Sequence, residues 1–186
     1  TESLSAIEAG MVDWILVDLR ISPDTTVARL AAILYADGTI RDAGGDSVLR
    51  FNVPPGSYYL AILHRSHLAA MTAARTTFQT GVMLDFTDTT LQVYGTCMIG
   101  LGTNTRGMIG GDVNQDRVLK YSGSGNDRSP ILQRILSEVG GSAINATIQG
   151  YFKEDLRMDG TVKYSGSGND PSLIIQNLTS LTGSNA

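Results

Sequence analysis

The stretch that decides the fold is Asp112-Val-Asn114-Gln-Asp116-Arg-Val118-Leu-Lys-Tyr-Ser-Gly-Ser-Gly-Asn126-Asp127. The same pattern returns 43 residues later as Asp155-Leu-Arg157-Met-Asp159-Gly-Thr161-Val-Lys-Tyr-Ser-Gly-Ser-Gly-Asn169-Asp170. Eight consecutive residues, from the lysine to the aspartate, are identical in the two copies. A loop that is repeated so closely predicts two related sites in one module.

The first copy places oxygen-bearing side chains at alternate positions. Asp112, Asn114 and Asp116 occupy positions one, three and five, which is how an EF-hand-type calcium loop begins. Calcium is a hard cation that takes six to eight oxygen ligands, including a backbone carbonyl at position seven. We therefore predict Ca²⁺ as the cofactor, with the carbonyl oxygens of Val118 and Thr161 at the seventh position of each loop.

A standard loop ends on a bidentate carboxylate at position twelve. Here a Ser-Gly-Ser-Gly insert delays the closing acid, so Asp127 and Asp170 are the predicted closing ligands, ahead of Asn126 and Asn169. The full set of predicted metal ligands is Asp112, Asn114, Asp116, Val118 and Asp127 in the first loop, and Asp155, Asp159, Thr161 and Asp170 in the second.

Two arginines depart from the calcium-loop pattern. Arg117 replaces the glycine that normally makes the sharp turn at position six, so the first loop must either accept a strained backbone or turn differently. Arg157 replaces the Asn or Asp of position three, which removes a ligand and puts a cation beside the ion. The first loop is therefore expected to be the better site. The alternative is that the two loops are acidic turns that keep their fold without binding a metal. It stays open, especially for the second loop.

Each loop is followed by apolar residues at helical spacing. The first set is Ile131, Leu132, Ile135, Leu136 and Val139, and the second is Ile174, Ile175, Leu178 and Leu181. Pro130 and Pro171 stand where a helix tolerates proline, in its first turn. The pattern predicts one helix after each loop.

A loop followed by one helix, given twice, resembles a dockerin. It is most similar to a dockerin-like repeat with the pattern Lys-Tyr-(Thr/Ser)-Gly-x-x-Asn-Asp-Arg-Asp-Pro-Ile-Leu, found near the C-terminus of secreted and surface proteins of Bacteroidetes bacteria. This chain carries the pattern from Lys120 to Leu132, and its second copy departs from it after Asp170. The resemblance implies a calcium-binding module and a secreted, extracellular or cell-surface location.

The preceding part of the chain predicts short strands. Runs rich in β-branched and aromatic residues, separated by turns roughly every ten residues, predict an antiparallel β-sandwich. The expected strands cover residues 11–19, 27–35, 47–53, 57–64 and 78–86. The stretch from Val53 to Leu63 is similar to a strand of transthyretin-like and other Ig-like modules, and it also resembles the domain that precedes the dockerin-like repeat.

These patterns predict four segments. Residues 1–10 form an N-terminal arm that could add a strand to a neighbour, 11–95 the β-sandwich domain, 96–110 a linker, and 111–186 the dockerin-like calcium-binding module. The expected fold class is mainly β with a small α module. We interpret the chain, which begins at Thr1 rather than at a methionine, as a mature or excised piece.

Composition excludes several classes of function. The chain of 186 residues has a net charge of −4, so it has no basic field for nucleic acid, and it has no apolar run long enough for membrane insertion. Cys97 is alone and cannot form an internal disulfide. His64 and His67 lack the further ligands of a zinc site. No nucleophile elbow or phosphate loop is present, so we do not expect an enzyme.

The functional expectation is a non-catalytic extracellular calcium-binding structural protein. As such it would self-associate, as a homo-oligomer or homopolymer, in a surface layer or an extracellular fibre. The alternative is a carbohydrate- or protein-binding module for adhesion or docking in a larger secreted protein, with a glycan or surface partner. An exposed aromatic strip on a sheet face would favour that alternative, and Trp14, Tyr58 and Tyr59 are its candidates.

Overall fold

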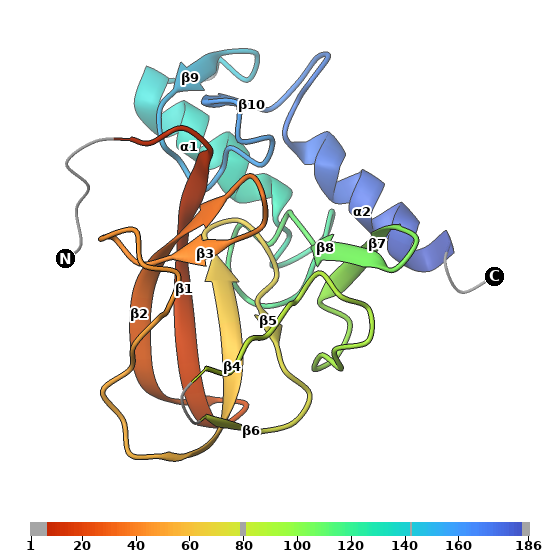
Figure 1. Ribbon diagram of the computed structural model, residues 1–186. Coiled ribbons are helices and arrows are strands. Elements are labelled where there is room, and N and C mark those ends of the chain that lie inside the picture. The colour runs from red at the N-terminus through yellow and green to blue at the C-terminus, as the bar shows by residue number, and fades with distance from the viewer. Residues whose placement is uncertain (1–6, 79–80, 142, 184–186) are drawn as a thin grey trace. The chain divides into compact units, whose positions relative to one another are not determined.

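The computed structural model describes residues 7–78, 81–141 and 143–183 (Figure 1). The chain divides into two compact units, which are described here one at a time. The first comprises Thr1–His64 and Ala69–Gly107, and the second Arg65–Leu68 and Met108–Ala186. Four residues after the strand that ends at His64 thus belong to the second unit, which sequence patterns alone did not indicate.

An antiparallel sheet forms the first unit (Figure 1). Its strand order is β3-β2-β1-β4-β5, and a further strand, β6, also pairs with β4. The strands are β1 (Met11–Ser22), β2 (Thr25–Tyr35), β3 (Ile40–Arg41), β4 (Gly56–His64), β5 (Ala70–Met71) and β6 (Thr76–Phe78). Two more, β7 (Met98–Gly102) and β8 (Thr105–Met108), pair separately as a hairpin.

The central strand β1 alternates in the way that a sheet with one packed face requires. Ile15, Val17 and Leu19 are each almost fully buried, and they point to the same face because side chains alternate along a strand. The opposite face of β1 carries Asp18, which is fully buried although it is charged. A buried charge is tolerated only when it is paired and hydrogen-bonded, so its partners matter for the stability of the sheet.

Two arginines and a threonine surround Asp18. Arg29 donates to its carboxylate at 2.7 and 2.9 Å, Arg20 at 2.9 and 3.2 Å, and the Thr26 hydroxyl at 3.0 Å. Burial alone would raise the pKa of the Asp18 carboxyl, but these hydrogen bonds outweigh burial and hold its pKa below the usual 3.8. The network ties β1 to β2 on the face away from Ile15 and Val17.

The mainly β, antiparallel architecture is confirmed, but two expected strands are wrong. Residues 47–53 form no strand, because Asp46 binds the Val48 N–H and the Arg50 guanidinium within the same short segment. Residues 81–86 of the expected strand 78–86 also form no strand, and the Asp85 carboxylate accepts hydrogen bonds from the N–H and the hydroxyl of Thr87. The finer expectation of a two-sheet sandwich stays a prediction.

The described part of the expected arm makes hydrogen bonds to the sheet, and the expected linker contains a hairpin. Residues 1–6 of the arm lie outside the described residues. Glu8 accepts a hydrogen bond from the Tyr35 hydroxyl, and the Gly10 carbonyl accepts one from Ala36 N–H. The expected linker, residues 96–110, contains the whole β7–β8 hairpin, and the boundary between the two units falls after Gly107.

The second unit contains both helices, as the spacing predicted. They are α1 (Arg128–Val139) and α2 (Pro171–Gly183), and a two-stranded sheet joins β9 (Thr147–Gln149) to β10 (Thr161–Lys163). Pro130 and Pro171 lie in the first turns. Equivalent positions of the two repeats share one core, which consists of Val113, Ile131, Ile135, Ile148, Leu156, Val162 and Ile174. No helix among the described residues is long and apolar enough to cross a membrane.

We predict that Asp18→Asn destabilises the first unit by about 3 to 5 kcal/mol at neutral pH, because it leaves two arginines without their counter-charge. Urea denaturation of both proteins measures the difference. The folded-state pKa is lowered, so the stabilisation is present above pH of about 4 and is lost as the pH falls below it. The gap between wild type and variant should therefore narrow in acid.

Asp46→Asn is the matched control, because it removes an exposed ion pair with Arg50 in the same unit. Such pairs contribute at most about 1 kcal/mol. Equal losses in the two variants would contradict the role given to Asp18.

Candidate functional site

The first loop curls around its own side chains. Asp112 lies at its start, and Oδ2 of its buried carboxylate accepts the Arg117 N–H at 3.2 Å. Asn114 Oδ1 accepts the Asp116 N–H, and Asp116 Oδ1 accepts the Val118 N–H, each at 2.9 Å. The side chains at loop positions one, three and five thus each accept a hydrogen bond from backbone further along the loop.

Both loops reach this shape through two left-handed residues. In the first loop Gln115 has φ 61° and Arg117 has φ 69°, and in the second Met158 has φ 54° and Gly160 has φ 81°. Of the two alternatives for Arg117, the loop therefore takes the strained one and keeps the same turn as its glycine counterpart. An L-residue with a side chain pays about 1 to 2 kcal/mol in this region, whereas glycine does not.

One oxygen of the first loop is unsatisfied. Asp112 is 3% exposed, and its Oδ1 is buried with no hydrogen-bond partner among the described residues. Burial, and then the charge of Asp127, raises the pKa of Asp112 to about 6, and the charge of Asp116 acts in the same direction. A buried acceptor without a donor costs about 1 to 3 kcal/mol, so this oxygen is a place where a ligand would be stabilising.

The predicted closing residues, Asp127 and Asp170, have a second role that sequence reasoning missed. Oδ1 of Asp127 accepts N–H groups from Val113 and Asn114 at 2.9 and 3.3 Å, and Oδ2 accepts that of Lys120 at 2.8 Å. The carboxylate therefore connects the beginning and the end of its loop. Whether it also binds the ion stays a prediction.

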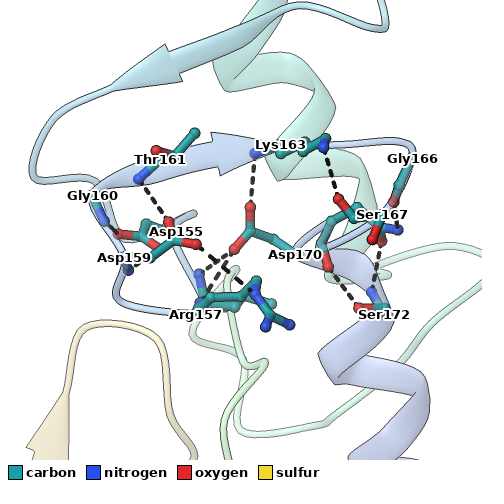
Figure 2. A network of polar contacts seen from close by, with 12 residues as sticks. Asp155, Arg157, Asp159, Gly160, Thr161, Lys163, Gly166, Ser167, Asp170 and Ser172 are labelled. Carbon is teal, nitrogen blue, oxygen red and sulfur yellow. Dashed lines mark hydrogen bonds and ion pairs between the residues drawn. The ribbon is translucent and has the colours of Figure 1, made fainter.

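Asp170 repeats this arrangement in the second loop (Figure 2). Its oxygens accept the N–H groups of Leu156, Arg157 and Lys163 at 2.9, 3.2 and 2.7 Å. Burial raises the pKa of Asp170 to about 6, because the three N–H bonds offset the loss of water only in part. The burial of Asp127 likewise raises its pKa.

The spacing between the lysine and the Ser-Gly-Ser-Gly insert, which is the same in both copies, is explained by a hydrogen bond. Lys120 Nζ donates to the Ser124 carbonyl, and Lys163 Nζ donates to the Ser167 carbonyl at 2.7 Å. The lysine side chain thus lies over the Ser-Gly-Ser-Gly segment and donates a hydrogen bond to one of its carbonyl groups. The only signal for this in the sequence is that the lysine and the segment are kept together in both copies.

Asn126 and Asn169 cap the helices that follow. Their side-chain oxygens accept N–H groups from Ser129 and Ser172, at 2.8 and 2.9 Å, which are among the groups that a helix start leaves unpaired. The amide nitrogens close the insert by donating to glycine carbonyls in both loops. Their lower rank as metal ligands stays a prediction.

The second loop satisfies its first aspartate differently (Figure 2). Both oxygens of Asp155 accept backbone N–H groups, from Asp159 at 3.3 Å and from Gly160 at 2.8 Å. The Asp159 carboxylate accepts the Thr161 N–H at 3.0 Å, and its other oxygen lies 3.9 Å from Arg157 Nε. The cation foreseen at position three thus faces the carboxylate at position five.

The loops also differ at position seven. Thr161 is the first residue of β10 and pairs with Gln149 of β9. Val118 belongs to no strand and is 56% exposed. Position seven of the second loop is therefore held in a strand pair, whereas position seven of the first loop is exposed to solvent.

The other candidate residues do not form a site. His64 binds Asp13 at 2.9 Å in the first unit, whereas His67 lies in the second unit beside the Ser66 hydroxyl. Among the described residues, no group of three or more His, Cys, Asp or Glu side chains is placed to hold a metal ion. A site in the first loop would therefore depend on oxygens outside that set, such as the Asn114 amide. Cys97 is buried, which raises the pKa of its thiol.

Comparisons with protein-family models, with curated proteins and with solved structures find no match for this chain. The case for a function therefore depends on the geometry of the two loops.

We predict that Arg117→Gly stabilises the second unit by about 0.5 to 1 kcal/mol, because glycine adopts the left-handed conformation without strain. Thermal unfolding with a chelator present measures the change without any contribution from bound metal.

Gly160→Ala is the mirror-image control. A methyl group at Gly160 has open space around it, so only its φ of 81° should matter, and the variant should lose about 1 kcal/mol. A loss of stability in Arg117→Gly would show that the arginine side chain contributes more than its strained backbone costs.

Proposed function

We propose that this chain is a non-catalytic extracellular structural protein that is stabilised by calcium and associates with further copies of itself. It would consist of a β-sandwich-type domain followed by a dockerin-like calcium-binding module. The observation that carries the proposal is the buried, unpartnered Oδ1 of Asp112. The other proposed ligands in this loop are Asn114, Asp116 and the Val118 carbonyl, with Asp127 close by.

Electrostatics favours a cation at this place. Burial and then the charges of Asp127 and Asp116 raise the pKa of Asp112, and burial followed by the charge of Asp116 raises that of Asp127. A divalent ion would neutralise this repulsion and give the free oxygen of Asp112 a partner. A mixed set of carboxylate, amide and carbonyl oxygens suits calcium better than magnesium, which demands a near-ideal octahedron.

The role of the ion would be structural. Asp112 immediately precedes the core residue Val113, and Asp127 immediately precedes α1. An ion between these points would fasten the loop to the core and to the helix at the same time.

Self-association is supported by an open sheet edge in the first unit. Strand β3 covers β2 only at Ile33 and Leu34, so the described residues leave the outer edge of β2 unpaired from Thr25 to Ala31. An uncovered edge presents free N–H and C=O groups that pair readily with a strand from another chain. The neighbour would be a second copy, in a fibre or a surface layer.

Glycan or partner binding is the alternative, and it has less support. Tyr58 is 8% exposed and therefore part of the core. The most exposed aromatic side chains that the structure describes are Tyr94 and Tyr151, which belong to different units. Trp14 and Tyr59 are partly buried and lie toward opposite ends of the β1–β4 pair, so the three predicted candidates form no continuous aromatic strip.

The proposal predicts that millimolar calcium raises the melting temperature of the chain relative to chelator. At ten times the dissociation constant the gain is about 1.4 kcal/mol. Asp112→Asn should abolish most of this gain, because it removes the charged ligand with the free oxygen. Differential scanning calorimetry measures the effect, with Asp88→Asn in the first unit as the control that keeps the gain.

A melting temperature that is the same with calcium and with chelator, for wild type and variants alike, would contradict a structural role for the ion.

Association is predicted to depend on the β2 edge. Val27→Lys places a charge on that edge, where Val27 is 42% exposed, and should shift particles seen by light scattering toward the monomer. Val48→Lys is the control, because Val48 is 54% exposed but lies outside the sheet. Wild-type protein that stays monomeric at high concentration, with calcium present, would rule out self-association.

A further inference from the structure

We infer that the module binds a single ion, in the first loop, and that the second loop holds the same shape without an ion because Arg157 takes its place. This inference rests on the proposed calcium role of the first loop and assigns the stoichiometry and the determinant of that role. It departs from the sequence expectation that Asp155, Asp159, Thr161 and Asp170 are ligands as well.

The first argument is the state of the two leading aspartates. Asp112 and Asp155 are equally buried, at 3% and 2% exposed, and both accept the N–H of position six. Oδ1 of Asp112 makes no hydrogen bond of ordinary length and interacts only weakly with the Asp116 N–H, whereas Oδ1 of Asp155 accepts the Asp159 N–H at 3.3 Å. At the leading aspartate, an ion in the second loop would have to compete with a hydrogen bond that is already made, and an ion in the first loop would meet a free oxygen.

The second argument is the residue at position three. In both loops a nitrogen of this side chain faces Oδ2 of the residue at position five: Asn114 Nδ2 lies 3.0 Å from Asp116, and Arg157 Nε lies 3.9 Å from Asp159. Asn114 also has an oxygen that can face a metal. Arginine has five donors, no acceptor and a permanent positive charge, so it repels a cation and cannot become a ligand.

The third argument is the support that each loop receives without metal. The second loop has glycine at its left-handed position six, and its position seven is paired in the β9–β10 sheet. The first loop has the strained Arg117 at position six and the exposed Val118 at position seven. The loop with the free oxygen is therefore also the loop with the weaker backbone support.

Native mass spectrometry of the full chain with calcium ions as the probe tests this inference. Wild type should carry one ion, Asp112→Asn none, and Asp155→Asn one. Arg157→Asn gives the second loop the same side-chain ligands as the first and should raise the number to two. Arg157→Lys keeps the positive charge and should leave it at one. Circular dichroism verifies that each variant is folded before ions are counted.

The outcomes separate the two proposals. Wild type without any ion would overturn calcium binding, and the single-ion inference with it. Two ions on wild type, or one ion that is lost in Asp155→Asn and kept in Asp112→Asn, would overturn the inference alone. One ion on folded Arg157→Asn would also overturn it, since the arginine would then not be what excludes the second ion.

Discussion

A buried carboxylate that accepts three backbone N–H groups holds each loop of the second unit closed. Asp127 and Asp170 do this in the same way, with two donors from the beginning of the loop and one from the lysine that starts the insert. Because these donors would otherwise be buried without partners, the carboxylate fixes the loop at both ends. The helix that follows begins directly after it, so the position of the helix depends on the same side chain.

Once both loops are closed in this way, small differences decide what each can bind. The shared frame places an aspartate in the core at the start of each loop and turns the backbone through left-handed residues at positions four and six. Within it, the second loop has glycine at its left-handed position six and a strand pair at position seven, whereas the first loop has the strained Arg117 and an exposed Val118. On our proposal, a cation would complete the first loop alone.

The features that the sequence could predict are those that depend on repetition and periodicity. Both helices, their proline-containing first turns and the shared core follow from the two identical segments and the apolar spacing after them. The long strands β1, β2 and β4 follow from their β-branched runs. The expected strand at 47–53 is also rich in apolar residues. Asp46, just before it, accepts hydrogen bonds from Val48 and Arg50, and local hydrogen bonds of this kind compete with a sheet.

The roles of the acidic residues could be predicted only in part. An aspartate that binds a cation and one that binds backbone N–H groups look alike in sequence, so Asp127 and Asp170 were expected as ligands and not as loop closures. One oxygen of Asp112 has no hydrogen-bond partner, whereas both oxygens of Asp155 have one. This difference depends on distances that no sequence pattern encodes.

The measurement that tests the central claim most directly is a calcium titration followed by NMR at the amides of Arg117 and Gly160, which donate to the two leading aspartates. We predict that the Arg117 resonance shifts and saturates while that of Gly160 stays in place; a Gly160 resonance that moves equally, or an Arg117 resonance that does not move, would contradict the account.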